Sequence, residues 1–238
     1  MHAPSPKLIP SDVLLLAYRS GIFPMADSRE DDEVFWVEPR RRAILPLDGF
    51  HCSRSLAKLL KQDRYRVTID ADFAAVVESC AKPRPDPVEG DSGTWISHAI
   101  AASYRNLHAH GHAHSVECWL DDRLVGGLYG VSFERVFCGE SMFSRADNAS
   151  KVALAWLVAI MRRAGFVLLD CQFMTGHLAS LGAVEITRND YQGMLAKACG
   201  VQPSCSLPQA HAALVQASAS TSASSPGKLI AQSLTQTS

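Results

Sequence analysis

The chain has 238 residues, of which 47% are hydrophobic, and its formal net charge is −1 at pH 7. A chain of this length and composition can bury one core and carry a small additional domain. The nearly neutral charge excludes binding of nucleic acid through a global basic field, so a nucleic acid would have to be bound by a local basic patch.

Cysteine usage and hydropathy narrow the class of protein further. The seven cysteines are an odd number without paired C-x-x-C spacing, which argues against a disulfide framework and against a thiolate zinc site. No apolar run approaches the roughly 18 residues that span a bilayer, and no basic segment followed by an apolar one stands at the start. We therefore expect a cytoplasmic protein.

Residues 1–62 predict a small N-terminal domain with two short helices. Ser11 is typical of an N-cap, and Gly21 stands where a left-handed residue ends a helix. Ser53 predicts the start of the second helix, in which leucines line one face. On another face of that helix three cations recur at i, i+4 and i+7, namely Arg54, Lys58 and Lys61.

A second basic cluster, Arg40-Arg41-Arg42, precedes this helix. Basic clusters are often only solvated surface. Here two such clusters lie close together in a chain without net positive charge. Contact with a phosphate backbone is therefore an equally open interpretation.

Residues 63–205 predict a larger domain of mixed helices and strands. A strand over 64–69 precedes a helix that Asp70 can cap, residues 82–93 predict a loop, and a helical pattern over 96–107 ends at Gly111. Three strand-like runs at 115–120, 123–132 and 135–143 are joined by connections short enough for hairpins. An apolar helix over 150–164 and a strand over 166–172 follow.

An antiparallel meander followed by a helix and a returning strand resembles the core of the GCN5-related acyltransferase fold. The expected fold class is α+β, with a small N-terminal domain plus a GCN5-related acyltransferase-like domain that has a mainly antiparallel sheet. Many α+β domains share this order of elements. Residues 206–238, rich in Ser, Ala, Thr and Gln, predict a largely disordered tail with at most a frayed helix around 211–215.

Two groups of polar residues could carry chemistry. The segment 139–145 contains Glu140, two hydroxyls and an arginine, and it predicts either a polar ligand site beside an apolar pocket or only the cap of the following helix. Asp170 ends an apolar strand, where a carboxylate needs a partner or a function unless the strand emerges into solvent. Period-2 alternation places Gln172 on the same face as Asp170.

Histidines and tryptophans suggest weaker candidates. A metal site is one interpretation of the alternating residues His108, His110, His112 and His114. Gly111 interrupts them between a helix and a strand, so their rings are not expected to converge on one ion. Trp36 and Trp95 predict either core side chains or platforms for a base or a ribose.

A series of motifs over residues 11–195 resembles the leucyl/phenylalanyl-tRNA-protein transferase family. The matching segments are YRSGIFP at 18–24, FW at 35–36, Pro39 with Arg42 shortly after, HCSRS at 51–55, GTWI at 93–96, GHAHSVE at 111–117, LVGGLYG at 124–130, GESMFSR at 139–145, NASK at 148–151, DCQ at 170–172 and ASLGA at 179–183. The sequence departs from the pattern at Met25, where many members have Trp, and at Thr175-Gly176, where some have Asn-Asp.

The resemblance implies an acyltransferase-like enzyme that needs no metal, no acetyl-CoA and no other cofactor. It implies transfer of Leu or Phe, and less readily Met, from aminoacyl-tRNA to acceptor proteins with N-terminal Arg or Lys, which marks them for degradation by the N-end rule pathway. No membrane partner is implied. Asp170 and Gln172 would assist the attack of the acceptor amine, Glu140 would orient the reacting groups, and Trp95 would lie beside the terminal adenosine.

Two binding surfaces follow from these expectations. An apolar pocket for the transferred side chain is expected on the meander, the long helix and the next strand, formed by Leu128, Phe137, Met161 and Leu169. The basic helix carrying Arg54, Lys58 and Lys61 would contact phosphates of the tRNA acceptor stem.

Two alternatives to the transferase stay open. An N-acetyltransferase that uses acetyl-CoA would need a glycine-containing phosphate nest before the long helix, but residues 145–150 contain no glycine. A non-catalytic tRNA- or peptide-binding module would be expected to have lost Asp170, Gln172 and Glu140, all of which are present.

Overall fold

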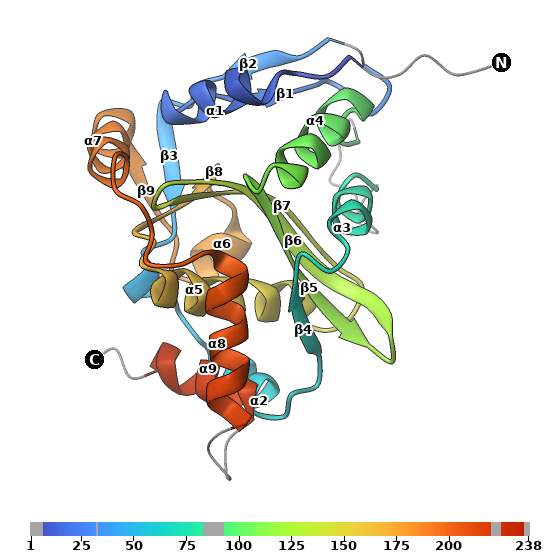
Figure 1. The fold of residues 1–238 in the computed structure, drawn as a ribbon, viewed down its shortest axis with the longest axis vertical. Helices are drawn as coiled ribbons and strands as arrows, with labels where there is room; N and C mark the ends of the chain where they lie inside the picture. Colours follow the sequence, from blue (N-terminus) through green and yellow to red (C-terminus); the bar gives the residue numbers. More distant parts are fainter. Residues whose placement is uncertain (1–6, 32, 83–92, 220–224, 236–238) are drawn as a thin grey trace, which may run out of the picture.

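The computed structural model describes residues 7–31, 33–82, 93–219 and 225–235. Its elements in chain order are α1 Ser11–Arg19, β1 Phe23–Met25, β2 Phe35–Val37, β3 Arg41–Ile44, the 3-10 helix η1 Leu47–Gly49, α2 Arg54–Lys61, β4 Arg66–Ile69, α3 Phe73–Cys80, α4 His98–Ala109, β5 Ala113–Leu120, β6 Arg123–Phe133, β7 Val136–Ser144, α5 Ala149–Ala164, β8 Leu168–Gln172, α6 Gly176–Ser180, β9 Val184–Thr187, α7 Arg188–Ala198, α8 Leu207–Ala219 and α9 Pro226–Thr235 (Figure 1). The expected α+β class is confirmed.

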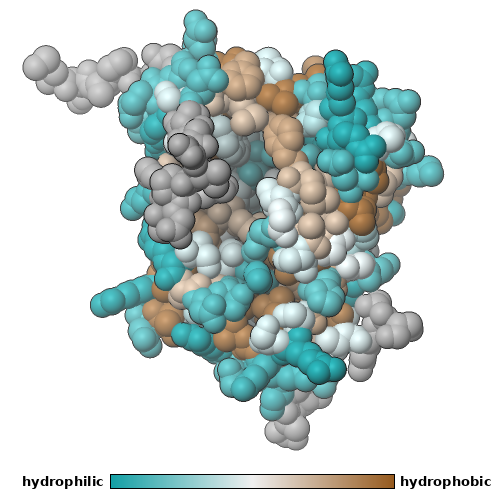
Figure 2. Space-filling view, turned by 180° about the vertical axis from the view of Figure 1, so that it is seen from behind, coloured by the Kyte–Doolittle hydropathy of each residue, from teal (hydrophilic) through white to brown (hydrophobic). Residues whose placement is uncertain are grey.

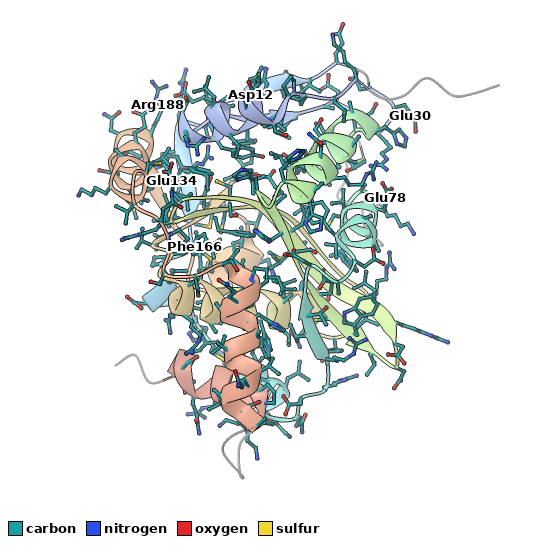
Figure 3. The ribbon with its side chains drawn as sticks, viewed as in Figure 1. Asp12, Glu30, Glu78, Glu134, Phe166 and Arg188 are labelled. Atoms are coloured by element: carbon teal, nitrogen blue, oxygen red, sulfur yellow. The ribbon has the colours of Figure 1, made fainter. Side chains whose placement is uncertain are left out.

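A small N-terminal part consists of α1 and the antiparallel pair β1–β2. Pro10, and not Ser11, occupies the N-cap of α1, because the helix begins at Ser11 itself, one residue earlier than a cap at Ser11 implies. Gly21 has a φ of +78° just after the helix, as its position predicted. This part is tied to the rest by Glu78 of α3, which pairs with Arg29 at 2.5 Å and with Arg105 at 3.0 Å (Figure 3).

Seven strands form the main sheet in the order β4-β5-β6-β7-β8-β3-β9. The meander β5–β6–β7 is confirmed within two residues of its predicted bounds. Asp121 and Asp122 link β5 to β6 with φ of 49° and 58°, as a tight two-residue hairpin requires. Neighbouring strands are antiparallel except β7 and β8, which run parallel because α5 crosses between them.

Helices cover both faces of this sheet. On one face α2, α5, α8 and α9 share a core with the sheet, and on the other face α1, α3, α4 and α7 share a second core. The helix α5 is buried along almost its whole length and ends at Gly165, whose φ is +80°. Burial on nearly all sides explains why the middle of its sequence, from Val152 to Met161, is apolar rather than amphipathic.

The predicted boundary at residue 62 differs from this arrangement. The strand β3 pairs with β8 and β9 inside the main sheet, and α2 packs against α5 and α9. Residues 41–62 therefore belong structurally to the sheet-containing part, and the small N-terminal part ends before β3.

The prediction of a largely disordered tail is wrong for residues 207–219 and 226–235, which form α8 and α9. Their alanine-rich composition favours helix, and their few apolar side chains, among them Leu207, Ile230 and Leu234, are buried against α5 and α2. Composition suggested disorder because these residues alone cannot make a core, but here they complete a core that other elements supply. In Figure 1 both helices lie with α2 at the end of the molecule opposite β1 and β2.

Candidate functional site

The candidate site lies where β7 and β8 stop pairing. Their parallel ladder ends at Cys138 and Asp170, and the next residues on the same faces are Glu140 and Gln172. Glu140 sits at a β-bulge, because Gly139 pairs with Gly130 and Ser141 with Tyr129, which leaves Glu140 as the extra residue. Bulges re-aim side chains and often lie beside active sites.

Glu140 is buried and accepts three hydrogen bonds. The donors are the hydroxyl of Tyr18 at 2.7 Å, the hydroxyl of Tyr104 at 2.9 Å and Nε2 of Gln172 at 3.0 Å. Burial raises the pKa of Glu140 to about 7, although all three hydrogen bonds act to lower it. A carboxyl group with a pKa near neutrality, lined by tyrosines, is typical of a functional site.

Asp170 is fully buried and pairs with Arg42. Arg42 donates from Nε to Oδ1 at 2.8 Å and from Nη2 to Oδ2 at 2.5 Å. The hydroxyl of Tyr191 donates to Oδ2 at 3.0 Å, and the backbone amide of Gln172 donates to Oδ1 at 2.9 Å. Burial alone would lower the pKa of Arg42, but Asp170 raises it above its ordinary value, so the guanidinium group keeps its charge.

Gln172 connects the two carboxylates. Its backbone amide is held by Asp170, and its side-chain amide donates to Glu140. Its φ of 61° lies in the left-handed region, which is uncommon for residues other than glycine and is concentrated at functional sites. Because Nε2 is directed at Glu140, the amide oxygen Oε1 is presented on the other side of the same planar group.

One exposed apolar side chain lies next to this cluster in the chain. Phe173, the residue after Gln172, is 46% exposed and makes an edge-to-face contact with buried Phe23 at 5.7 Å between ring centroids. Figure 2 shows a hollow near the middle of the face opposite to that of Figure 1, with apolar surface beside it.

The structure brings the predicted catalytic residues together but divides the predicted binding residues. The four expected pocket residues are all buried in the core on the α5 side of the sheet, namely Leu128, Phe137, Met161 and Leu169. Trp95 is half-buried against the other core, where its carbonyl oxygen accepts a hydrogen bond from the amide of Ala26 at 3.2 Å.

The two basic clusters have different environments. The side chains of Arg54, Lys58 and Lys61 are exposed on α2, and among the described residues they form no ion pair. Arg42 is only 2% exposed and is held by Asp170, so the hypothesis of a phosphate contact is wrong for this residue.

Four site residues were missed in the sequence: Tyr18, Arg42, Tyr104 and Tyr191. Tyr18 begins the first matching motif, and that motif was the only signal for it. Tyr104 and Tyr191 lie on helices α4 and α7, where their spacing indicates only a buried helix face. Arg42 directly precedes the apolar run Ala43-Ile44-Leu45, which indicates a buried strand and could have marked the arginine as needing an acid partner.

The histidines are used structurally. His108 Nδ1 lies 2.8 Å from the carbonyl oxygen of Ala113, and His114 Nδ1 lies 2.7 Å from Oδ2 of Asp70. Asp72, and not Asp70, caps α3, because Asp70 is turned to His114 and the amide of Ser115. Within the described ranges no three His, Cys, Asp or Glu residues are grouped as metal ligands.

The fold and the site together define an α+β protein with two buried carboxylates joined by one amide. Residues 44–196 match the family model described as leucyl/phenylalanyl-tRNA protein transferase, and residues 9–40 match the model of its N-terminal domain. Similar relatives carry the name leucyl/phenylalanyl-tRNA–protein transferase. One from Novosphingobium aromaticivorans is 54% identical and covers 98% of both chains, and one from Zymomonas mobilis is 61% identical over 77% of this chain and 67% of the relative.

The chain therefore belongs to the leucyl/phenylalanyl-tRNA protein transferase family, and its enzyme class is that of an aminoacyltransferase. Among solved structures, that of L-PGS from Bacillus licheniformis covers 71% of this chain and 55% of its own, at 12% identity and a TM-score of 0.38, a similarity too low to carry an argument. None of the helices in the described parts is long and apolar enough to cross a membrane.

Proposed function

We propose that this protein moves Leu or Phe, and less readily Met, from aminoacyl-tRNA to the N-terminal Arg or Lys of an acceptor protein, which marks the acceptor for degradation by the N-end rule pathway. The observation that carries the proposal is the bridge from Glu140 through Gln172 to Asp170 at the end of the β7–β8 ladder. The family name supports an aminoacyl-tRNA donor and a protein acceptor, and the geometry of the bridge supports a place for the acceptor amine beside Gln172.

The reaction needs little more than positioning and removal of a proton. The acceptor nitrogen attacks the ester carbonyl, the bond from that carbon to the ribose oxygen breaks, and the amine proton leaves with the ribose hydroxyl or with a nearby base. Because the ester is already activated, holding amine and carbonyl in attack geometry contributes several kcal/mol. Oε1 of Gln172 can accept a hydrogen bond from the amine, since Nε2 is already directed at Glu140.

Charge in the site favours a cationic acceptor. Asp170 pairs with the cation Arg42, whereas the three hydrogen-bond donors that the structure gives Glu140 are uncharged. When Glu140 is ionised, the site therefore carries a net negative charge that attracts an N-terminal ammonium or the side chain of Arg or Lys. We assign Glu140 to orientation of the acceptor.

Asp170 acts through Gln172 rather than on the amine itself. Its oxygens already accept from Arg42, Tyr191 and the Gln172 amide, so little capacity remains for a proton from the substrate. In this proposal Asp170 is a positioning residue that fixes the unusual backbone of Gln172, and the amine proton is taken up elsewhere.

The donor would occupy the region from the sheet to α2. The transferred side chain enters between the meander and α5, where Leu128, Phe137, Met161 and Leu169 lie in one apolar cluster. Trp95 offers an aromatic face to the terminal adenosine, and the three cations of α2 contact acceptor-stem phosphates.

A transfer assay tests the proposal. Purified protein is incubated with radiolabelled Leu-tRNA and an acceptor beginning with Arg, in parallel with labelled acetyl-CoA and with the same acceptor beginning with Asp. We expect label from Leu-tRNA only on the Arg acceptor. Label from acetyl-CoA would favour the acetyltransferase, and tight tRNA binding without any transfer would favour the binding module.

A further inference from the structure

We infer that the C-terminal helix α9 is a brace that positions α2, and that it thereby supports the binding of charged tRNA. The inference rests on the contact between α2 and tRNA proposed above. It assigns a role to residues 226–235, which lie beyond both segments that match the family models.

The helix α2 cannot hold its own position. It has eight residues, and isolated helices shorter than about 12–15 residues are marginal in water. Its buried side chains Leu56, Leu59 and Leu60 share a core with Ile230, Ala231 and Leu234 of α9. Since α2 packs against α9 more extensively than against α5, much of its stability comes from the C-terminal helix.

The two helices also meet through their backbones. The amide of Gly227, at the start of α9, donates a hydrogen bond of 2.8 Å to Oδ1 of Asp63, just beyond the end of α2. A Cβ atom at Gly227 would overlap the carbonyl oxygen of Leu60, so only glycine permits this approach. The separation of the two helices is thus fixed at this end.

The segment that enters α2 is tied to α9 as well. Arg162 of α5 donates from Nη1 to the carbonyl oxygen of Ser233 on α9 at 2.8 Å, and from Nε to that of Leu47 in η1 at 2.9 Å. One guanidinium group therefore joins α9 to the short helix that precedes α2. With Gly227 at the other end, both ends of the α2 segment are attached to the brace.

The expected consequence concerns binding and not chemistry. Arg54, Lys58 and Lys61 can match successive phosphates only if α2 keeps its place on the core. Glu140 and Gln172 hydrogen-bond to α1, α4 and each other, and none of these groups lies on α2 or α9. Loss of α9 should therefore weaken tRNA binding and leave the rate of the bound complex unchanged.

The test compares the full chain with a chain that ends at Ala219 and lacks α9. Affinity for Leu-tRNA, the single-turnover transfer rate at saturating tRNA, and amide exchange of residues 57–61 without tRNA are measured. We expect an affinity loss of about tenfold or more, faster exchange in α2 and a rate within about twofold of the full chain. Unchanged affinity, or a loss of rate at unchanged affinity, overturns the inference.

Point variants cover the case in which the shortened chain does not fold. Asp63→Ala and Asp63→Asn remove the same charge, but only Asn keeps an acceptor for the Gly227 amide and tolerates the φ of 45° found here. Asp63→Ala should bind tRNA more weakly than Asp63→Asn, and equal affinities contradict the brace. Leu207→Ala is the control, because it opens the same core on α8, which packs most extensively against α5, and it should leave affinity unchanged.

One further variant separates this inference from the proposed function. Arg54→Ala/Lys58→Ala/Lys61→Ala in the full chain should weaken tRNA binding and flatten its salt dependence. If it does not, the proposed tRNA contact of α2 fails. Exchange in α2 still reports whether α9 holds that helix in place, so the two failures are distinguishable.

Discussion

Arg42 and Asp170, which are 128 residues apart in the sequence, form a buried ion pair with two hydrogen bonds of 2.8 and 2.5 Å. Their side chains are 2% and 0% exposed. The guanidinium group also donates to the carbonyl oxygen of Gly21 and stacks over the rings of Phe23 and Tyr191. One side chain therefore joins the N-terminal part, β8 and α7 at the candidate site.

The first prediction is that Arg42→Ala strongly destabilises the fold. Removing one partner of a buried pair leaves an uncompensated charge, which costs about 3–5 kcal/mol. The free energy of unfolding in urea measures this cost. Arg41→Ala is the matched control, since the neighbouring Arg41 pairs with Glu185 at the surface, where such pairs contribute about 0–1 kcal/mol. Equal effects of both variants would contradict the assigned role of Arg42.

The second prediction concerns pH. The pKa of Glu140 is raised to about 7 by burial, so the folded state holds its proton more tightly than the unfolded state. Its contribution to stability is present below pH 4.5 and is lost as pH rises to about 7. Wild type should lose stability relative to Glu140→Gln across this window, by on the order of 3 kcal/mol.

Glu134 provides a control of opposite sign (Figure 3). Burial would raise its pKa, but hydrogen bonds from Cys199 and Gly200 and the charge of Arg19 hold the pKa below its ordinary value. Its contribution is therefore present above the unfolded pKa and is lost as pH falls. Denaturant titrations of Glu134→Gln at several pH values should show the reverse trend, and a trend parallel to that of Glu140→Gln would refute both assignments.

The meander and the long helix could be predicted because their signals are local. Period-2 runs separated by two residues fix β5 and β6, and a long apolar run ended by Gly165 fixes α5. The same alternation correctly placed Asp170 and Gln172 together, although the left-handed backbone at Gln172 gave no sign in the sequence.

The rest depends on contacts between distant segments. The apolar run after Arg42 gives only a weak local sign that it differs from Arg41, and the position of β3 between β8 and β9 is what buries one and exposes the other. The C-terminal helices were missed for the same reason, because their composition resembles that of disordered tails and their stability comes from the core they cover.

The third prediction concerns selectivity. Shape should dominate, with one methylene worth about 1–3 kcal/mol, so Leu, Phe and Met are accepted while the β-branched Ile and Val are poor donors. Leu169→Ala enlarges the proposed pocket and should shift kcat/KM toward Phe relative to Leu. Leu107→Ala makes the same change in the other core, at a residue equally buried, and should lower stability without changing the Phe/Leu ratio. Equal Phe/Leu ratios of kcat/KM in the two variants would show that Leu169 does not line the pocket.

The last prediction is that Asp170 and Gln172 act as one unit. Asp170→Asn weakens the hydrogen bonds that Asp170 accepts from Arg42 and from the backbone amide of Gln172. Gln172→Ala removes the side-chain amide that donates to Glu140. Because a small misplacement of a reacting group can cost on the order of 10²-fold in rate, each variant should slow single-turnover transfer by roughly this amount. Charged-tRNA affinity should stay nearly unchanged, since neither side chain lies on α2.

The double variant and a control decide whether the two residues share one function. If Asp170 acts through Gln172, the fold-loss of rate in the double variant should be much smaller than the product of the fold-losses in the two single variants. Tyr191→Phe is the control, because it removes one donor to Asp170 but leaves Arg42 and the Gln172 amide in place, and its rate should stay within about threefold of wild type. Multiplicative losses would show that Asp170 has a separate role in catalysis, and a large loss of tRNA affinity with unchanged chemistry would move both residues from catalysis to binding.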